Sequence, residues 1–323
     1  MSELSELDDL YVGIDLGGTK ILGLIANSKG LVLSESVLPT PAEEDFHSSI
    51  QVISEVVSKI VSKSPKVKLK GVGVAAAGAI NSHTGTVVHT PQLPLWKNVP
   101  LVSILEKKLM LPVVIGNDAN LAALSEHRYG VAQGVKNVLY VTISTGIGGG
   151  ILIDGQIFTG WHGFAGEVGH ASVNVNGPFG KSTVPGAVES FSSGAALARI
   201  ANELITSGHS TKIKGSKLSA ENIFEAFHEG DKLAKSVIDQ GILHLGFGLT
   251  NMVNILDPEM LIIGGGLSKE WDSYIKPSVE IMRNLSFAGI GKDINVVSPK
   301  LGVNAGALGG VALAADHFAG TNP

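Results

Sequence analysis

The sequence contains no cysteine among its 323 residues. A chain without thiols cannot form disulfides, use a thiolate nucleophile or bind zinc through cysteine. It also lacks an uninterrupted apolar run of about 18 residues, the length that a membrane-spanning helix needs. The most apolar helix-like stretch, 241–256, is interrupted by His244, Asn251 and Asn254. The sequence therefore predicts neither a disulfide framework nor a membrane span.

Charge is sparse, because only 16% of the residues are charged, and 24 Lys and Arg against 29 Asp and Glu give a net charge of −5. Nucleic-acid binding usually needs a basic stripe, and this sequence has none. The first ten residues, MSELSELDDL, are acidic and lack the apolar core of a secretory signal. We expect a cytoplasmic protein that binds neither nucleic acid nor membrane.

What the sequence does contain is apolar residues (44%) and 41 glycines, many of them in short clusters. Such a chain is long enough for two lobes with substantial cores. Apolar runs bounded by turn residues and stretches of helical spacing alternate along it, which predicts an α/β protein. The expected strands are 10–16, 21–27, 31–37, 71–79, 113–116, 138–144, 150–153 and 261–266, and the expected helices are 43–63, 119–129, 188–206, 219–229, 231–255, 268–284 and 304–317.

Two segments resemble each other at a constant offset of 129 residues. YVGIDLG, from Tyr11 to Gly17, aligns with YVTISTG, from Tyr140 to Gly146, and each reads as strand, glycine turn, strand. The match predicts two halves built on one plan, each opening with a β-hairpin whose glycine tip faces a shared cleft.

The first glycine turn combines residue types that suit a phosphate. Gly17 and Gly18 let backbone N–H groups approach phosphate oxygens, and Thr19 and Lys20 can donate hydrogen bonds to them. Asp15, at the strand end, can hold Mg²⁺, usually through water. A tight turn with an exposed lysine is the alternative, and the spacing is not that of a Walker loop.

The second turn, with Thr145 and Gly146, offers the same chemistry, and again a plain glycine-rich turn is the alternative. Two such turns at corresponding places are more specific than either alone. Gly264 and Gly265 follow an apolar strand and could pass under an adenine or a ribose.

Polar residues also follow a strand in GNDAN, where Asn117 and Asp118 stand at a strand-to-helix junction. Asp118 is a good helix cap, and its carboxylate is also the group that could accept a hydroxyl proton during phosphoryl transfer. Glu167 and His170 could both bind a polyol, and Glu189 begins a predicted helix, where the helix dipole favours a carboxylate. Ordinary surface polarity is the alternative for Glu167 and His170.

Together these motifs resemble the ROK family (repressor, open reading frame, kinase), and most closely its bacterial and archaeal glucokinases. The resemblance runs through DLGGTK, GNDANLAALSE, STGIGGG, ExGH, GAVESFSSGAAL, LIIGGG and AGALGGVAL, in that order. It implies a two-lobed, actin-like (ribonuclease H-like) ATPase fold, with a small lobe of 1–117 plus about 305–323 and a large lobe of 118–304.

The resemblance also implies roles for single residues. Asp118 matches the catalytic base, and Gly78, Asn117, Glu167, His170 and Glu189 match sugar ligands. The phosphate and metal site corresponds to Asp15, Gly17, Gly18, Thr19, Lys20, Thr145 and Gly146, and the adenosine site to Gly264 and Gly265.

The sequence departs from the family in one major place. Most members carry a zinc motif of three cysteines, which would fall at Gly180, Ser182 and Ala187 here, so no structural zinc is expected. Smaller departures are Ala77 and Ala79, where prolines are common, and Asn81, where a carboxylate is usual.

The implied activity is transfer of the ATP γ-phosphate, with Mg²⁺, to the 6-hydroxyl of a hexose, glucose above all. N-acetylglucosamine, N-acetylmannosamine, mannose, allose and fructose are rival acceptors. A repressor is the alternative of another class, and the few acidic residues before the first motif disfavour it. A non-catalytic sugar sensor is a further alternative, disfavoured by the presence of Asp118 and both glycine turns. Relatives are commonly dimers or tetramers, so a homodimer or homotetramer is expected.

Overall fold

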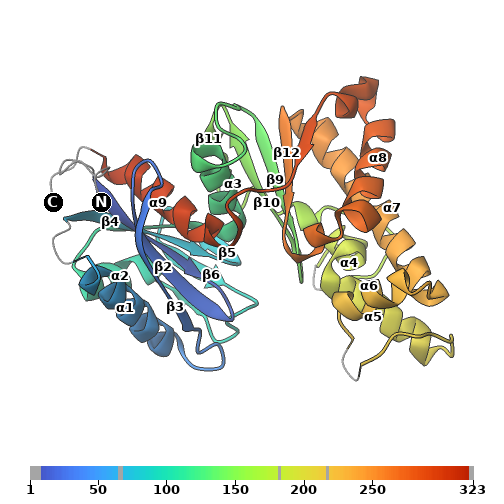
Figure 1. Ribbon diagram of the computed structural model, residues 1–323, viewed down its shortest axis with the longest axis horizontal. Coiled ribbons are helices and arrows are strands. Elements are labelled where there is room, and N and C mark those ends of the chain that lie inside the picture. Colours follow the sequence, from blue (N-terminus) through green and yellow to red (C-terminus); the bar gives the residue numbers. More distant parts are fainter. Residues whose placement is uncertain (1–8, 65–67, 181–182, 216–217, 320–323) are drawn as a thin grey trace. The chain divides into compact units, whose positions relative to one another are not determined.

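The computed structural model describes residues 9–64, 68–180, 183–215 and 218–319, and Figure 1 labels its elements. The chain forms two compact units, 1–136 with 150–166 and 299–323, and 137–149 with 167–298. The lobe boundaries expected from the sequence stay a prediction. Helix α3 (Asp118–Tyr129), which that prediction gave to the second lobe, falls in the first unit.

The first unit is built on a five-stranded sheet in the order β3-β2-β1-β4-β8. Strand β1 pairs antiparallel with β2 and parallel with β4, while β2 and β3 pair antiparallel and β4 and β8 parallel. The bounds are β1 Leu10–Leu16, β2 Lys20–Asn27, β3 Val32–Pro39, β4 Leu69–Ala76 and β8 Val113–Asn117. A smaller sheet, β5 (Ala79–Asn81), β6 (Thr86–His89) and β7 (Lys97–Val99), follows β4 in the chain and was not expected from the sequence.

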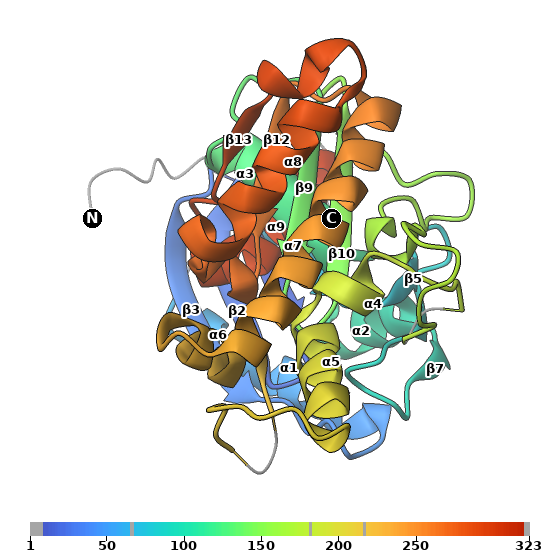
Figure 2. The same ribbon diagram turned by 90° about the vertical axis from the view of Figure 1, so that its right-hand side faces the viewer.

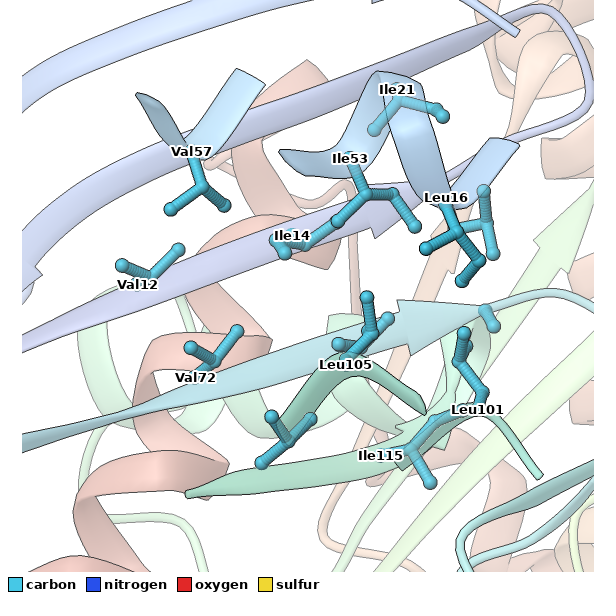
Figure 3. Close-up of a cluster of buried hydrophobic side chains, with 14 of the residues drawn as sticks. Val12, Ile14, Leu16, Ile21, Ile53, Val57, Val72, Leu101, Leu105 and Ile115 are labelled. Carbon is cyan, nitrogen blue, oxygen red and sulfur yellow. The ribbon is translucent and has the colours of Figure 1, made fainter. Parts of the chain in front are cut away.

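One face of the five-stranded sheet carries aliphatic side chains that pack against α1 (Phe46–Ser62) and α2 (Leu101–Leu109). Because side chains alternate along a strand, Val12, Ile14 and Leu16 of β1 all lie on this face. Figure 3 shows them in one cluster with Ile53 and Val57 of α1. Burial of these side chains holds the helices on this face.

The opposite face of the sheet carries α9 (Ala305–Phe318), which lies unusually close to the strands. A Cβ added to Gly13 of β1 would meet the carbonyl oxygen of Ala307, and one added to Gly73 of β4 would meet that of Gly310. The glycines therefore remove the side chains that would separate helix from sheet.

The second unit contains most of a sheet in the order β11-β10-β9-β12-β13, and β10 passes into the first unit at Gly150. Helices α7 and α8 cover one face of it, as both views show (Figure 1, Figure 2). The strands are β9 Val138–Ile143, β10 Ile147–Ile153, β11 Gln156–Ile157, β12 Met260–Gly264 and β13 Asn295–Val297, and the helices are α4 Glu189–Ser192, α5 Gly194–Thr206, α6 Ala220–His228, α7 Lys232–Leu256 and α8 Lys276–Leu285.

The two sheets have the same connectivity, which confirms the predicted repeat. In each, the strand that opens the motif (β1 or β9) lies between its hairpin partner (β2 or β10) and a later parallel strand (β4 or β12). The sequence match at an offset of 129 residues therefore marks equivalent strands.

Three expected elements differ in detail. The helix expected over 188–206 is broken at Ser193, whose extended backbone ends α4 and whose side chain caps α5. The helix expected over 268–284 begins as 3-10 and π turns before α8. The loop expected over 145–150 is mostly strand, because β10 begins at Ile147. Gly150 of this strand lies so close to α3 that an added Cβ would meet the Ala119 carbonyl.

No helix in the described ranges is long and apolar enough to cross a bilayer.

The close contact of α9 with β4 predicts that a side chain at Gly73 destabilises the fold. Gly73→Ala should lower the free energy of unfolding by about 1–3 kcal/mol or more, because the helix must move away from the strand. Gly266→Ala is the control, since its added Cβ would have only an ordinary 3.5 Å contact with the Ser144 hydroxyl. Urea unfolding of both variants measures the difference, and equal stability would contradict the proposed packing constraint.

Candidate active site

The junction between β8 and α3 places two polar side chains side by side. Asn117, not Asp118, caps the helix: its Oδ1 accepts from the backbone N–H of Ala119 at 2.9 Å and of Asn120 at 3.2 Å. Its Nδ2 donates to the carbonyl oxygen of Gly78 at 3.1 Å. One amide therefore fixes the start of α3 and the Gly78 loop together.

Asp118 is the first residue of α3, and its half-buried carboxylate is not needed as the cap. Burial raises the pKa of this carboxyl, while the backbone N–H groups of Ala119 and of Asp118 itself oppose the shift. A carboxylate with a raised pKa at the end of a strand has the protonation behaviour that a general base needs.

Asp15 lies in β1, immediately before the glycine turn. Burial raises the pKa of its carboxyl to about 6; the nearby Asp118 carboxylate adds to the shift and Lys20 opposes it. Gly306 of α9 lies so close that an added Cβ would stand 2.8 Å from the carboxyl carbon of Asp15. Asp15 and Asp118 belong to the same unit, and the Asp118 carboxylate lies close enough to act on the pKa of Asp15.

These two carboxylates suit Mg²⁺. Burial is the main cause of the raised pKa of Asp15, and repulsion by the Asp118 carboxylate adds to it. A divalent cation relieves such repulsion, and carboxylate oxygen is its preferred protein ligand. Mg²⁺ takes one or two carboxylates and completes its coordination with water and substrate phosphates. In the described ranges no group of three His, Asp or Glu side chains could hold a metal ion by itself.

The tip of the β1–β2 hairpin is braced by two residues that the sequence did not single out. The Gly17 N–H donates to the Lys20 carbonyl at 3.1 Å, and the Gly18 N–H donates to Oε1 of Gln92 at 2.8 Å. The Thr40 hydroxyl donates to the Gly17 carbonyl at 2.7 Å, and the Thr40 N–H to the Thr19 carbonyl at 3.0 Å. Thr19 and Lys20 themselves are exposed.

In the second unit, the equivalent turn lies against Glu189. Oε2 of Glu189 accepts from the N–H of Ile147 at 2.9 Å, and a Cβ at Gly146 would stand 2.5 Å from that oxygen. The Thr145 carbonyl accepts from the N–H of Ala195, near the start of α5. The predicted phosphate turn and a predicted sugar ligand are thus in direct contact.

Glu167 and His170 flank a short 3-10 turn, Val168–His170, which brings His170 Nε2 to 3.6 Å from Glu167 Oε2. Gly264 ends β12, and Gly265 has a φ of +89° with Ile143 of β9 directly behind it. Any side chain at Gly265 would meet the Ile143 backbone, which explains this glycine structurally.

Backbone hydrogen bonds hold the described parts of the segment from Ala171 to Val188, in which the resemblance places the missing zinc-binding cysteines. Val173 N–H donates to the Gly186 carbonyl at 2.9 Å, Gly186 N–H to the Pro178 carbonyl at 2.8 Å, and Val188 N–H to the Ala171 carbonyl at 2.9 Å. Gly186 has a φ of +63° and lies against Asn174. Of the three cysteine positions, Gly180 packs on Ser190 and Ala187 is buried, while Ser182 lies outside the described residues.

The predicted site residues thus form two groups, one in each unit. The first comprises Asp15, Gly17, Gly18, Thr19, Lys20, Gly78, Asn117 and Asp118, and the second Thr145, Gly146, Glu167, His170, Glu189, Gly264 and Gly265. The sequence did not identify Gln92, Thr40 or Gly306 as site residues, because the residues that they contact are distant in sequence. Of the three, only Gly306 lies in a recognised motif, the closing AGALGG.

The raised pKa of Asp15 predicts a pH-dependent stability. Its folded pKa of about 6 exceeds the ordinary 3.8, so the folded state binds the proton more tightly and loses stability as pH rises between these values. Asp15→Asn removes that loss. The stability of this variant relative to the unmodified protein should therefore increase from pH 4 to pH 7, as measured by urea unfolding without Mg²⁺. The exposed Asp272→Asn is the control; a pH-independent difference for Asp15→Asn would contradict the assignment.

The segment preceding Glu189 makes a second prediction. An added Cβ in Gly186→Ala would collide with the Asn174 carbonyl, so the segment must open. If Glu189 binds the sugar, the KM for sugar should rise roughly 10- to 100-fold while the KM for ATP stays unchanged. Gly208→Ala shares the positive φ but meets nothing within 4 Å, and serves as the control. Unchanged sugar kinetics in Gly186→Ala would separate this segment from sugar binding.

Comparison with known proteins places this geometry in a family. The ROK family model matches residues 11–317. A glucokinase of Halalkalibacterium halodurans is 35% identical over 94% of both chains, and a xylose repressor of Caldicellulosiruptor bescii is 32% identical over 94% of this chain and 77% of its own. The crystal structure of a ROK family glucokinase from Streptomyces griseus, in complex with glucose and AMPPNP, has a TM-score of 0.78 at 30% identity and covers 95% of this chain and 99% of its own. The chain belongs to the ROK family and has its actin-like ATPase fold.

Proposed function

We propose that this protein is an ATP-dependent hexokinase that transfers the γ-phosphate of ATP to the 6-hydroxyl of a hexose, with glucose as the preferred acceptor. The observation that carries the proposal is the pair Asp118 and Asp15. Asn117 rather than Asp118 caps the helix, and Asp15, whose pKa is raised by burial and further by the Asp118 carboxylate, stands in β1 just before the glycine turn. The similarity to glucokinases over nearly the whole chain supports it.

In this proposal Asp118 accepts the proton of the sugar hydroxyl as the new O–P bond forms. Its neighbour Asn117 retains one N–H beyond the hydrogen bond to Gly78, and that N–H can donate to the sugar. Since Asn117 is held through three hydrogen bonds, it would orient the acceptor next to the base with little loss of side-chain freedom.

The second unit supplies the other sugar ligands of the proposal. Glu189 uses Oε2 to hold Ile147, and its Oε1 can accept from a sugar hydroxyl. Glu167 precedes a 3-10 turn that His170 ends, so an acceptor and a donor are presented together.

The phosphate half of the proposal uses the two hairpin turns. When bound, Mg²⁺ would neutralise charge on the phosphate oxygens, and Asp15 would hold it, through water or directly. Lys20, Thr19 and Thr145 donate hydrogen bonds to phosphate oxygens, which stabilises charge in the transition state. Gly264 and Gly265 border the adenosine.

A second candidate is a sugar sensor without kinase activity, because the C. bescii relative is a xylose repressor. A sensor needs the sugar ligands but not the base. Coupled ADP release over glucose, N-acetylglucosamine, N-acetylmannosamine, mannose, allose, fructose and xylose, scored by kcat/KM, tests both candidates. Release with none of these sugars would overturn the kinase, and the highest kcat/KM identifies the preferred acceptor.

The base role of Asp118 makes the next prediction. Asp118→Ala should reduce kcat by about 10²–10⁴-fold, the usual contribution of a general base, and should leave the fold intact because Asn117 keeps the cap. Asp239→Ala, which removes an exposed ion pair on α7, is the control and should retain full turnover. Turnover of Asp118→Ala close to that of the unmodified protein would remove Asp118 from this role.

A further inference from the structure

Gln92 covers the tip of the first glycine hairpin. Its Oε1 accepts from the Gly18 N–H at 2.8 Å, and a Cβ added to Gly18 would lie 2.8 Å from its Cβ and 3.2 Å from its Oε1. Gly18 therefore lacks a side chain in order to accommodate Gln92, besides any role in approaching phosphate.

This contact is supported by a rigid segment. Gln92 is exposed, but the next residue, Leu93, is only 2% exposed, and Trp96 only 1%, and both belong to the core that α1 and α2 cover. The Leu93 N–H donates to the Thr90 carbonyl and the Trp96 N–H to the Leu93 carbonyl, which closes two turns around them. The backbone of Gln92 is thus fixed to the core.

The hydrogen bond also fixes which end of the carboxamide points where. A backbone N–H can only donate, so the atom next to Gly18 must be the oxygen. The Nε2 group, with two N–H donors, then lies beside the hairpin tip, and no described residue accepts from it. The Gly18 N–H is thus used by Gln92, and the two N–H groups of Gln92 Nε2 are the donors left at the hairpin tip.

We infer that Gln92 is a further phosphate-binding residue, which donates from Nε2 to an oxygen of the nucleotide phosphates while Oε1 positions Gly18. The inference rests on the proposed function, which places those phosphates at this hairpin. Gln92 acts beside Thr19 and Lys20, and it supplies a neutral donor on a side chain that Gly18 keeps oriented.

The informative variant is Gln92→Glu. It keeps an oxygen for the Gly18 N–H but replaces Nε2 by a second carboxylate oxygen, which repels phosphate. We expect the KM for ATP to rise roughly 10- to 100-fold, as for a lost hydrogen bond to a charged group. The KM for sugar and the melting temperature should stay unchanged. Gln92→Leu, which removes both polar atoms without adding charge, should also raise the KM for ATP.

Gln51→Glu is the matched control. Gln51 is an exposed residue of the same unit, and its Oε1 accepts from Lys108 Nζ at 3.3 Å, a contact that the variant keeps. It adds the same charge on α1 rather than at the hairpin and should leave the KM for ATP unchanged. An equal rise in the KM for ATP in Gln51→Glu would show that the added negative charge repels ATP from either position. That result would overturn the inference.

Calorimetric binding of AMPPNP with Mg²⁺ provides a readout that does not need a sugar. Weaker binding to Gln92→Glu and Gln92→Leu, but not to Gln51→Glu, supports the inference even if the protein phosphorylates no sugar. Unchanged or tighter binding to both Gln92 variants would overturn it, and an active unmodified enzyme would then leave the proposed kinase function standing.

Discussion

The cap of α3 by Asn117 is the interaction on which the candidate chemistry depends. A helix that begins directly after a strand needs an acceptor for its first N–H groups, and Asp118 could have supplied it. Because Asn117 does so with its oxygen and holds Gly78 with its nitrogen, the neighbouring Asp118 shares only the Ala119 N–H, through Oδ1 at 2.9 Å. The Asn117 amide thus carries most of the structural task at this junction.

A second constraint comes from the small residues of α9. The helix approaches β1 and β4 closely only because Gly13 and Gly73 lack side chains, and this approach brings Gly306 against the carboxylate of Asp15. The resulting burial contributes most to the raised pKa of Asp15. The packing of α9 on the sheet therefore affects the pKa of Asp15, since a helix held further away would leave this carboxyl more hydrated.

Local sequence patterns predicted much of this arrangement. The repeat of YVGIDLG and YVTISTG identified equivalent strands, since backbone pairing follows from short apolar runs and glycine turns. The same reasoning took Asp118 as the helix cap and was wrong by one residue, because asparagine and aspartate both cap helices well and local sequence does not show at which of them the helix begins. The break at Ser193 was missed because the apolar spacing continues through it, and only the serine cap of α5 reveals it. Gln92 lies 74 residues from Gly18, and no local pattern joins them.

The segment before Glu189, the proposed sugar ligand, shows how a chain without cysteine can order this region. A metal cross-link would fix this segment by a few strong bonds between distant side chains, whereas here several backbone hydrogen bonds and the positive φ of Gly186 do so. Each such bond contributes only about 1 kcal/mol, so the order must come from their number and from packing. Phe191 supplies that packing: it is buried, lies against Gly177 and stacks on His244 of α7, with 3.7 Å between ring centroids. The segment is thus attached to a long helix of its own unit, and Glu189 lies two residues before that attachment.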